Sequence, residues 1–69
     1  MHVKPEQRIA RRERILELLK KCGSQKESEI SELIGVSVPT VRGDLSVLLR
    51  QNRVCIHLSG HGYKRWSAL

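Results

Sequence analysis

The sequence predicts a small, mainly α domain that ends in a β-hairpin, and three observations along its 69 residues support this. Apolar residues recur at helical spacing in three successive segments, which Gly23 and Gly35 separate. The second and third segments are joined by a tight turn that contains Gly35, as in a helix-turn-helix. Two short strand-like runs, at about 54–58 and 63–66, then flank a glycine-rich turn. Together these features predict a winged helix-turn-helix, with three helices and the hairpin as the wing.

Length and composition indicate one domain over residues 1–69, ordered from about 5 to 66. No apolar run approaches the roughly 20 residues that cross a bilayer, and the first residues lack the apolar stretch of a signal peptide. The two cysteines, Cys22 and Cys55, do not form a pattern typical of disulfide-rich secreted domains. We therefore expect a cytoplasmic protein with reduced thiols and no contact with a membrane.

The chain carries a formal net charge of +6, and the positive charge is concentrated at its two ends. Residues 1–22 contribute +4 and residues 53–69 contribute +3, whereas residues 23–35 contribute −2. A polyanion such as nucleic acid fits this distribution. A membrane surface fits it less well, because surface helices usually carry aromatic residues and this chain has only two. The same scarcity argues against a stacking platform for single strands.

The first helix is predicted from Pro5, which suits a helix start, to about Cys22, just before Gly23. Its apolar positions are Ile9, Ile15, Leu16, Leu18, Leu19 and Cys22. Arginines gather in its N-terminal half: Arg8, Arg11, Arg12 and Arg14. Two interpretations of this cluster stay open: a solvated face paired with glutamates along the helix, or a set of phosphate contacts.

The second helix is predicted to begin at a capping box, with Ser24 as the N-cap and Glu27 at the third helical position. It runs from about Gln25 or Glu27 to Ile34, and Gly35 ends it. Its expected core side consists of Ile30, Leu33 and Ile34. Its expected solvent side carries Glu27, Glu29 and Glu32.

The third helix is predicted over residues 37–51, with Ser37 as the N-cap and Pro39 in the first turn, where a missing N–H costs nothing. The residues expected to face the core are Val38, Val41, Leu45, Leu48 and Leu49. The opposite face is slim and polar and consists of Ser37, Pro39, Thr40, Arg42, Gly43 and Ser46. A DNA major groove of about 12 Å admits a helix with such a face, which identifies a recognition helix. Gly43 destabilises a helix by about 1 kcal/mol relative to alanine. Two explanations for a glycine at this position stay open: a close approach to a partner, or neutral drift.

The hairpin begins after Asn52, which can adopt the left-handed conformation that ends a helix. We expect its apolar side to cover the third helix with Val54, Ile56, Leu58 and Trp66. The wing, residues 59–65, then carries three basic candidates for contact with the DNA backbone: His61, Lys64 and Arg65.

Other kinds of site find little support in the sequence. The chain has no nucleophile, base and acid set and no phosphate-binding loop, so we expect neither an enzyme nor a cofactor. Cys55 and His57 share a strand face, as two metal ligands would, but the ligand spacings of known zinc motifs are absent. We therefore predict no metal site.

A run of matching positions extends the prediction. Arg12, Ile15, Leu16 and Leu19 fit an R-x-x-I-L-x-x-L pattern. Val36-Ser37, Thr40-Val41-Arg42 and Asp44-Leu45 then fit V-S-x-x-T-[IV]-R-x-D-L. Over about residues 11–58 the sequence resembles the N-terminal domain of DeoR-type transcription regulators. The resemblance implies that Ser37, Thr40 and Arg42 face the DNA groove and that Asp44 orients Arg42 or a neighbouring residue.

The sequence departs from this family at three places, one of which is the family's glycine-rich segment after the wing strand, matched only loosely by Ser59-Gly60-His61-Gly62. Gly43 replaces a second arginine, which removes one expected DNA contact. The family's large C-terminal domain, which senses sugar phosphates, has no counterpart in the 69 residues, so the resemblance does not imply a response to an inducer.

The sequence thus predicts a regulator of transcription, a repressor, that binds double-stranded DNA sequence-specifically. Helix 37–51 lies in the major groove with Arg42 on a guanine, while Arg11, Arg12 and the wing contact phosphate. The alternative is a winged-helix module that binds another protein. A homodimer or a larger regulatory partner also stays open, because one such domain reads few base pairs.

Overall fold

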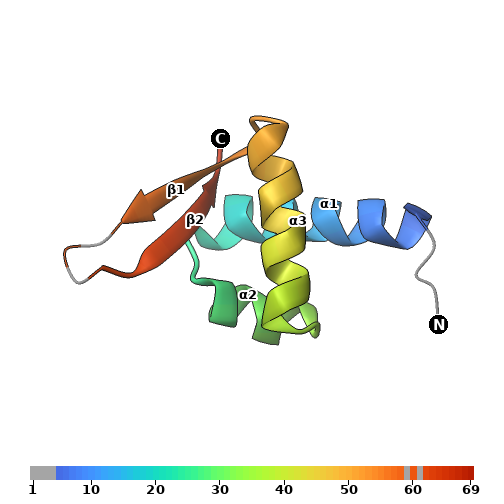
Figure 1. The fold of residues 1–69 in the computed structure, drawn as a ribbon, viewed down its shortest axis with the longest axis horizontal. Coiled ribbons are helices and arrows are strands. Elements are labelled where there is room, and N and C mark those ends of the chain that lie inside the picture. The colour runs from blue at the N-terminus through green and yellow to red at the C-terminus, as the bar shows by residue number, and fades with distance from the viewer. Residues whose placement is uncertain (1–4, 59, 61) are drawn as a thin grey trace.

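The computed structural model describes residues 5–58, 60 and 62–69, and it has the predicted winged helix-turn-helix fold. Its elements are α1 (Pro5–Cys22), α2 (Glu27–Ile34), α3 (Val38–Arg50), β1 (Val54–Leu58) and β2 (Lys64–Ala68). Helix α3 crosses α1, and α2 lies beside the start of α3 (Figure 1). The hairpin projects on the side where α1 ends, opposite the N-terminus of the chain. None of the described helices combines the length and apolar character of a membrane span.

The turn between α2 and α3 is closed by local hydrogen bonds. Gly35 has φ 82°, a left-handed conformation that costs glycine little. The N–H groups of Gly35 and Val36 both donate to the Ser31 carbonyl, at 2.9 and 3.2 Å. Asn52 likewise adopts φ 58° after α3, which confirms the predicted end of that helix. The positions at which α2 and α3 end are therefore encoded in residues close to each turn.

The start of α2 corrects the sequence-based prediction, because Ser24 is not its N-cap. The helix begins at Glu27, and the N–H of Lys26 donates to the carboxylate of Glu29 at 3.0 Å. The preceding residue, Gln25, pairs with Trp66 of β2 through two backbone hydrogen bonds of 2.9 and 2.8 Å. This bridge holds the α1–α2 connection in an extended conformation, so the helix starts at Glu27, the later of the two predicted positions.

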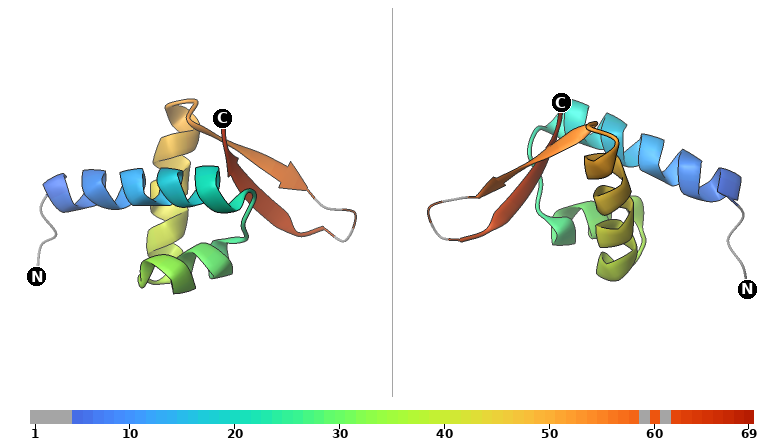
Figure 2. Two further views of the ribbon diagram at one scale, coloured as in Figure 1. Left: turned by 180° about the vertical axis from the view of Figure 1, so that it is seen from behind. Right: turned by 45° about the horizontal axis from the view of Figure 1, so that its top comes forward.

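The core lies where the three helices meet the base of the hairpin. It consists of Ile15, Leu16, Leu19, Ile30, Val41, Leu45, Leu48, Val54 and Trp66. Six side chains at the predicted apolar positions are exposed: Ile9, Cys22, Leu33, Leu49, Ile56 and Leu58. Leu33 and Leu58 are the clearest cases, at 57% and 72% exposed. The outer part of the hairpin extends past the described helices (Figure 2), and Leu58 is exposed there.

The hairpin is antiparallel, and Val54 pairs with Ala68 and Leu58 with Lys64 at its two ends. Strand β2 therefore reaches Ala68, beyond the predicted 63–66. The Leu69 N–H also donates to the Arg53 carbonyl at 3.0 Å. Together with the bridge between Gln25 and Trp66, these bonds attach the base of the wing to the helices.

An exposed ion pair joins α1 to the start of β1. The two terminal nitrogens of Arg53 donate to the Glu13 carboxylate at 2.8 and 3.2 Å. This hydrogen-bonded contact lowers the pKa of Glu13 below its ordinary value. A lowered pKa in the folded state stabilises the fold above the unfolded-state pKa, and this stabilisation disappears as the pH falls through the lowered pKa.

We therefore expect Glu13→Gln to have a slightly lower unfolding temperature than the native chain at neutral pH, and the same unfolding temperature in acid. Thermal unfolding followed by circular dichroism across the carboxylate titration range measures the difference. A difference that persists unchanged in acid contradicts this assignment.

Candidate nucleic-acid interface

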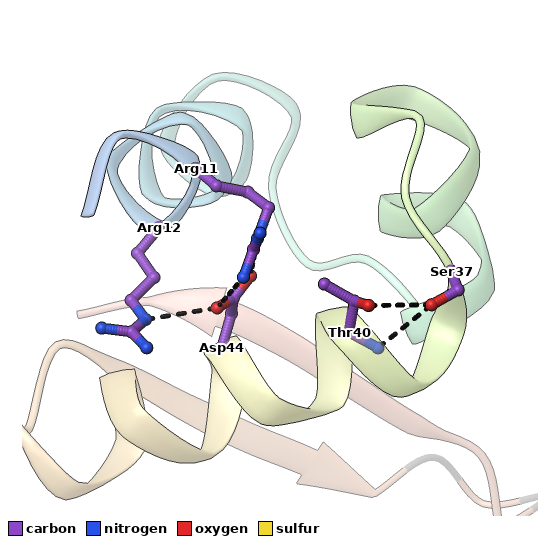
Figure 3. Close-up of polar contacts among 5 residues, drawn as sticks. All are labelled: Arg11, Arg12, Ser37, Thr40 and Asp44. Atoms are coloured by element: carbon purple, nitrogen blue, oxygen red, sulfur yellow. Dashed lines mark hydrogen bonds and ion pairs between the residues drawn. The ribbon is translucent and has the colours of Figure 1, made fainter. Parts of the chain in front are cut away.

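The N-terminal end of α3 carries the predicted cap. Ser37 is extended, and its hydroxyl oxygen accepts a hydrogen bond from the Thr40 N–H at 3.4 Å. The two hydroxyl groups also lie 2.8 Å apart (Figure 3). Pro39 occupies the first turn, as predicted. The cap therefore places the hydroxyls of Ser37 and Thr40 together at the start of the helix.

The predicted polar face of α3 is open to solvent along its length. Ser37, Pro39, Arg42, Gly43 and Ser46 are exposed and Thr40 is half-buried. A Cβ added to Gly43 would meet no atom within 4 Å, so packing within the domain does not require glycine there. The face is thus available to a partner.

Arg42 forms its described ion pair with α2 and not with Asp44. Its Nε donates to Glu27 Oε2 at 2.7 Å. The Arg42 side chain is 68% exposed, whereas that of Glu27 is only 17% exposed. Of the two predicted alternatives for Asp44, the orientation of Arg42 is therefore wrong, since Glu27 of the neighbouring helix binds this arginine.

An open groove of about 470 Å³ lies between α2, α3 and residues 62–64 of the wing. Its lining residues are Lys26, Glu27, Ser28, Val38, Arg42, Gly62, Tyr63 and Lys64. The Lys26 ammonium sits 4.3 Å from the centre of the Tyr63 ring, a cation–π contact. Three cations thus line this groove against one carboxylate, so it attracts anions.

Asp44 is buried, at 2% exposed, and binds two arginines of α1 (Figure 3). Arg11 donates to it through Nε and Nη2, the latter at 2.9 Å, and Arg12 donates through Nε at 3.2 Å. The hydrogen bond from Arg11 to Asp44 raises the pKa of Arg11. Arg11 and Arg12 are only 18% and 23% exposed, so they do not form the solvated face that was one of the two interpretations of the arginine cluster. They hold α3 against α1.

The basic residues predicted in the wing divide into three cases. Lys64 is exposed, begins β2 and lines the groove. Arg65 is half-buried and donates to the Ser24 carbonyl at 3.1 Å, so it helps to attach the wing to the α1–α2 connection. His61 lies outside the residues that the structure describes.

Comparison with known proteins agrees with this geometry. Residues 11–63 match the DeoR-like helix-turn-helix domain. The chain belongs to this family. A DeoR-like helix-turn-helix domain is a DNA-binding module. No match was found among curated proteins.

Among solved structures, the DeoR-like chain is similar to the Zalpha domain of PKZ from Carassius auratus, crystallised in complex with Z-DNA. The TM-score is 0.82, with 24% sequence identity over 91% of this chain and 98% of that chain. At this level of identity the similarity shows the fold, which is the winged helix described above.

A polar cluster on the hairpin of the DeoR-like domain lies away from the groove residues. His57 Nε2 lies 2.7 Å from Ser67 Oγ and 3.4 Å from Cys55 Sγ. Both cysteines are free thiols. The described residues contain no group of three or more His, Cys, Asp or Glu side chains that could hold a metal ion.

Sequence reasoning missed Lys26, Glu27 and Tyr63 as residues of the candidate interface. Glu27 was placed on the solvent side of α2, and Lys26 and Tyr63 were assigned no role. A basic residue immediately before a helix and an aromatic residue next to Lys64 of the wing are the signals that were available. Neither signal shows that the two residues meet, because the contact depends on how the wing packs beside α2.

Proposed function

We propose that this domain binds double-stranded DNA sequence-specifically and regulates transcription by occupying its operator as a cytoplasmic repressor. The observation that supports this most directly is the exposed polar face of α3, with Arg42 near its middle and Ser37 and Thr40 at its start. A helix presents base-reading side chains in this way when its N-terminal part enters the major groove.

Arg42 is the proposed base-reading residue. Its terminal nitrogens match guanine O6 and N7, the commonest specific contact in a major groove. Pro39 and Thr40 lie on the same face and can contact a thymine methyl group. Gly43 and Ser46 leave room for the helix to approach the base edges.

Phosphate contacts supply affinity without sequence information. We propose Lys64, Arg65 and His61 of the wing for this role, together with Arg12, whose described contact with Asp44 uses only Nε. Arg11 binds Asp44 through two nitrogens, so we propose that it acts mainly by supporting α3.

Chemical-shift mapping with random duplex DNA at two salt concentrations tests this proposal. We expect shifts in residues 37–46 and 60–65, and a steep loss of affinity at the higher salt concentration. Shifts confined to other parts of the surface would contradict the interface. An alternating cytosine–guanine duplex, followed by circular dichroism, shows whether the domain instead favours left-handed DNA, the ligand of the PKZ domain.

Two substitutions separate the proposed roles. Arg42→Ala should remove about 1–3 kcal/mol of discrimination at one base position, whereas Lys64→Ala should weaken binding to all sequences alike. Selection from a library of short duplexes with a randomised centre measures both effects. Equal effects of the two changes on selected and random duplexes would contradict the assignment.

The alternative proposal is a module that binds another protein through α3. Such a module should respond weakly to salt and should not prefer any duplex. We also propose a homodimer or a larger regulatory partner, because one winged domain reads only a short site. Sedimentation of the free protein and of its complex with a selected duplex tests this proposal.

A further inference from the structure

We propose that Glu27 is a positioning residue for DNA recognition: it holds Arg42 ready for a guanine and thereby sharpens sequence preference. This inference rests on the proposed function, in which Arg42 reads a base. The proposal gives Glu27 a favourable role in DNA binding, although its negative charge alone would oppose binding.

The geometry of the ion pair leaves the base-reading part of Arg42 available. A guanidinium group presents five N–H donors in a rigid, planar fork. The described contact with Glu27 uses Nε at 2.7 Å. Bidentate contact with guanine O6 and N7 requires two donors in parallel, which the terminal nitrogens supply. One guanidinium group can therefore bind Glu27 and a guanine at the same time.

The two partners differ in how firmly the fold holds them. Glu27 is the first residue of α2, where a carboxylate is favoured by the helix dipole, and its side chain is 17% exposed. Arg42 is 68% exposed and would otherwise sample many rotamers. Glu27 is therefore the fixed partner and Arg42 the oriented one, so part of the ordering that DNA binding requires is already present in the free protein.

The carboxylate also affects non-specific binding. Lys26, Arg42 and Lys64 line the same groove, which would attract any phosphate backbone if Glu27 were neutral. The charge of Glu27 opposes this attraction on every sequence, whereas its contact with Arg42 assists binding only where a guanine is in place. The repulsion alone lowers specific and non-specific affinity alike, so it is the contact with Arg42 that raises the ratio of specific to non-specific affinity.

The experiment measures this ratio for a duplex selected by the native protein and a scrambled duplex of equal length, at one salt concentration. Glu27→Gln should bind the scrambled duplex more tightly and lower the ratio by about threefold to tenfold. Glu27→Asp keeps the charge but is too short to maintain the contact, so it should lower the ratio without tighter binding to the scrambled duplex. It also tests the proposal independently if Glu27→Gln does not fold.

Glu32→Gln is the matched control, because it removes the same charge from an exposed position of the same helix. It should change both affinities by the same factor and leave the ratio unaltered. If Glu27→Gln and Glu27→Asp also leave the ratio unaltered, the inference is wrong.

Arg42→Ala in the same assay separates this inference from the proposed function. If Arg42→Ala leaves the ratio unchanged, the proposed base contact fails and Glu27 has nothing to position. If Arg42→Ala lowers the ratio and the Glu27 variants do not, only the role of Glu27 fails. When both roles hold, adding Glu27→Gln to Arg42→Ala lowers the ratio no further, because the two residues act through one contact.

Discussion

Asp44→Ala is expected to lower the free energy of unfolding by about 3 kcal/mol, which is large for a domain of this size. The substitution removes a buried carboxylate and leaves two guanidinium groups without their partner. Removing one member of a buried ion pair typically costs about 3–5 kcal/mol. We expect the lower end because Arg11 and Arg12 each retain some contact with water.

The same substitution should weaken DNA binding on all sequences, because Asp44 is the described ionic link between α3 and α1. Urea unfolding followed by circular dichroism measures the first effect, and titration with a duplex measures the second. Asp44→Asn keeps the shape and one acceptor, so it should fall between the native chain and Asp44→Ala.

A double-mutant cycle shows whether the loss comes from this network. Arg11→Ala and Asp44→Ala together should cost less than the sum of the single changes, because both remove one shared contact. Strictly additive costs would mean that Asp44 stabilises the domain through other contacts.

Trp66→Ala is expected to have an effect of similar size, about 3–5 kcal/mol. Trp66 belongs to the core, and β2 packs against both α1 and α2. Its removal leaves a cavity at the point where the wing joins the helices. Urea unfolding followed by far-ultraviolet circular dichroism measures the loss, because the variant has no tryptophan fluorescence.

Leu58→Ala provides the control within the same hairpin. It removes an apolar side chain that is 72% exposed, so it should change the free energy of unfolding by only about 0.5 kcal/mol or less. Amide hydrogen exchange at Gln25 gives a second measurement, since its N–H donates to Trp66. If Trp66→Ala leaves that amide fully protected, the bridge does not depend on the packing of the tryptophan.

The parts of the fold that were predicted correctly are encoded by neighbouring residues. The cap at Ser37, the left-handed residues Gly35 and Asn52, and the spacing of Val41 and Leu45 each depend on a few positions along the chain. Steric limits on φ and the helical repeat act over the same short distances. The three helices and the hairpin could therefore be predicted from the sequence.

The predictions that failed involve residues far apart in the chain. The bridge from Gln25 to Trp66 takes the place of the predicted cap at Ser24, and no local pattern reveals it. Asp44 lies in a helix that carries a polar face, yet its partner is Arg11, 33 positions earlier. The prediction that Leu33 and Leu58 are buried failed for a related reason. Their exposure depends on how far the neighbouring helices and strands extend.

The candidate site was predicted in outline only. Composition and spacing identify the polar face of α3, and it is exposed as expected. The partner of Arg42 could not be predicted, because Glu27 lies on another helix and its charge suggested a solvated position. Contacts between elements, rather than the elements themselves, decide which cations remain available to DNA.

The ion pairs within the domain also affect how many ions are released when it binds DNA. In the described part of the chain, Arg11, Arg12, Arg42 and Arg53 each already have a carboxylate partner. If a phosphate displaces such a carboxylate, the arginine exchanges one anion for another, and the freed carboxylate takes up a cation from solution. The cation released from the DNA is thus offset by one bound to the protein. The number of ions set free on binding is therefore set by cations such as Lys64, and not by the full basic content of the sequence.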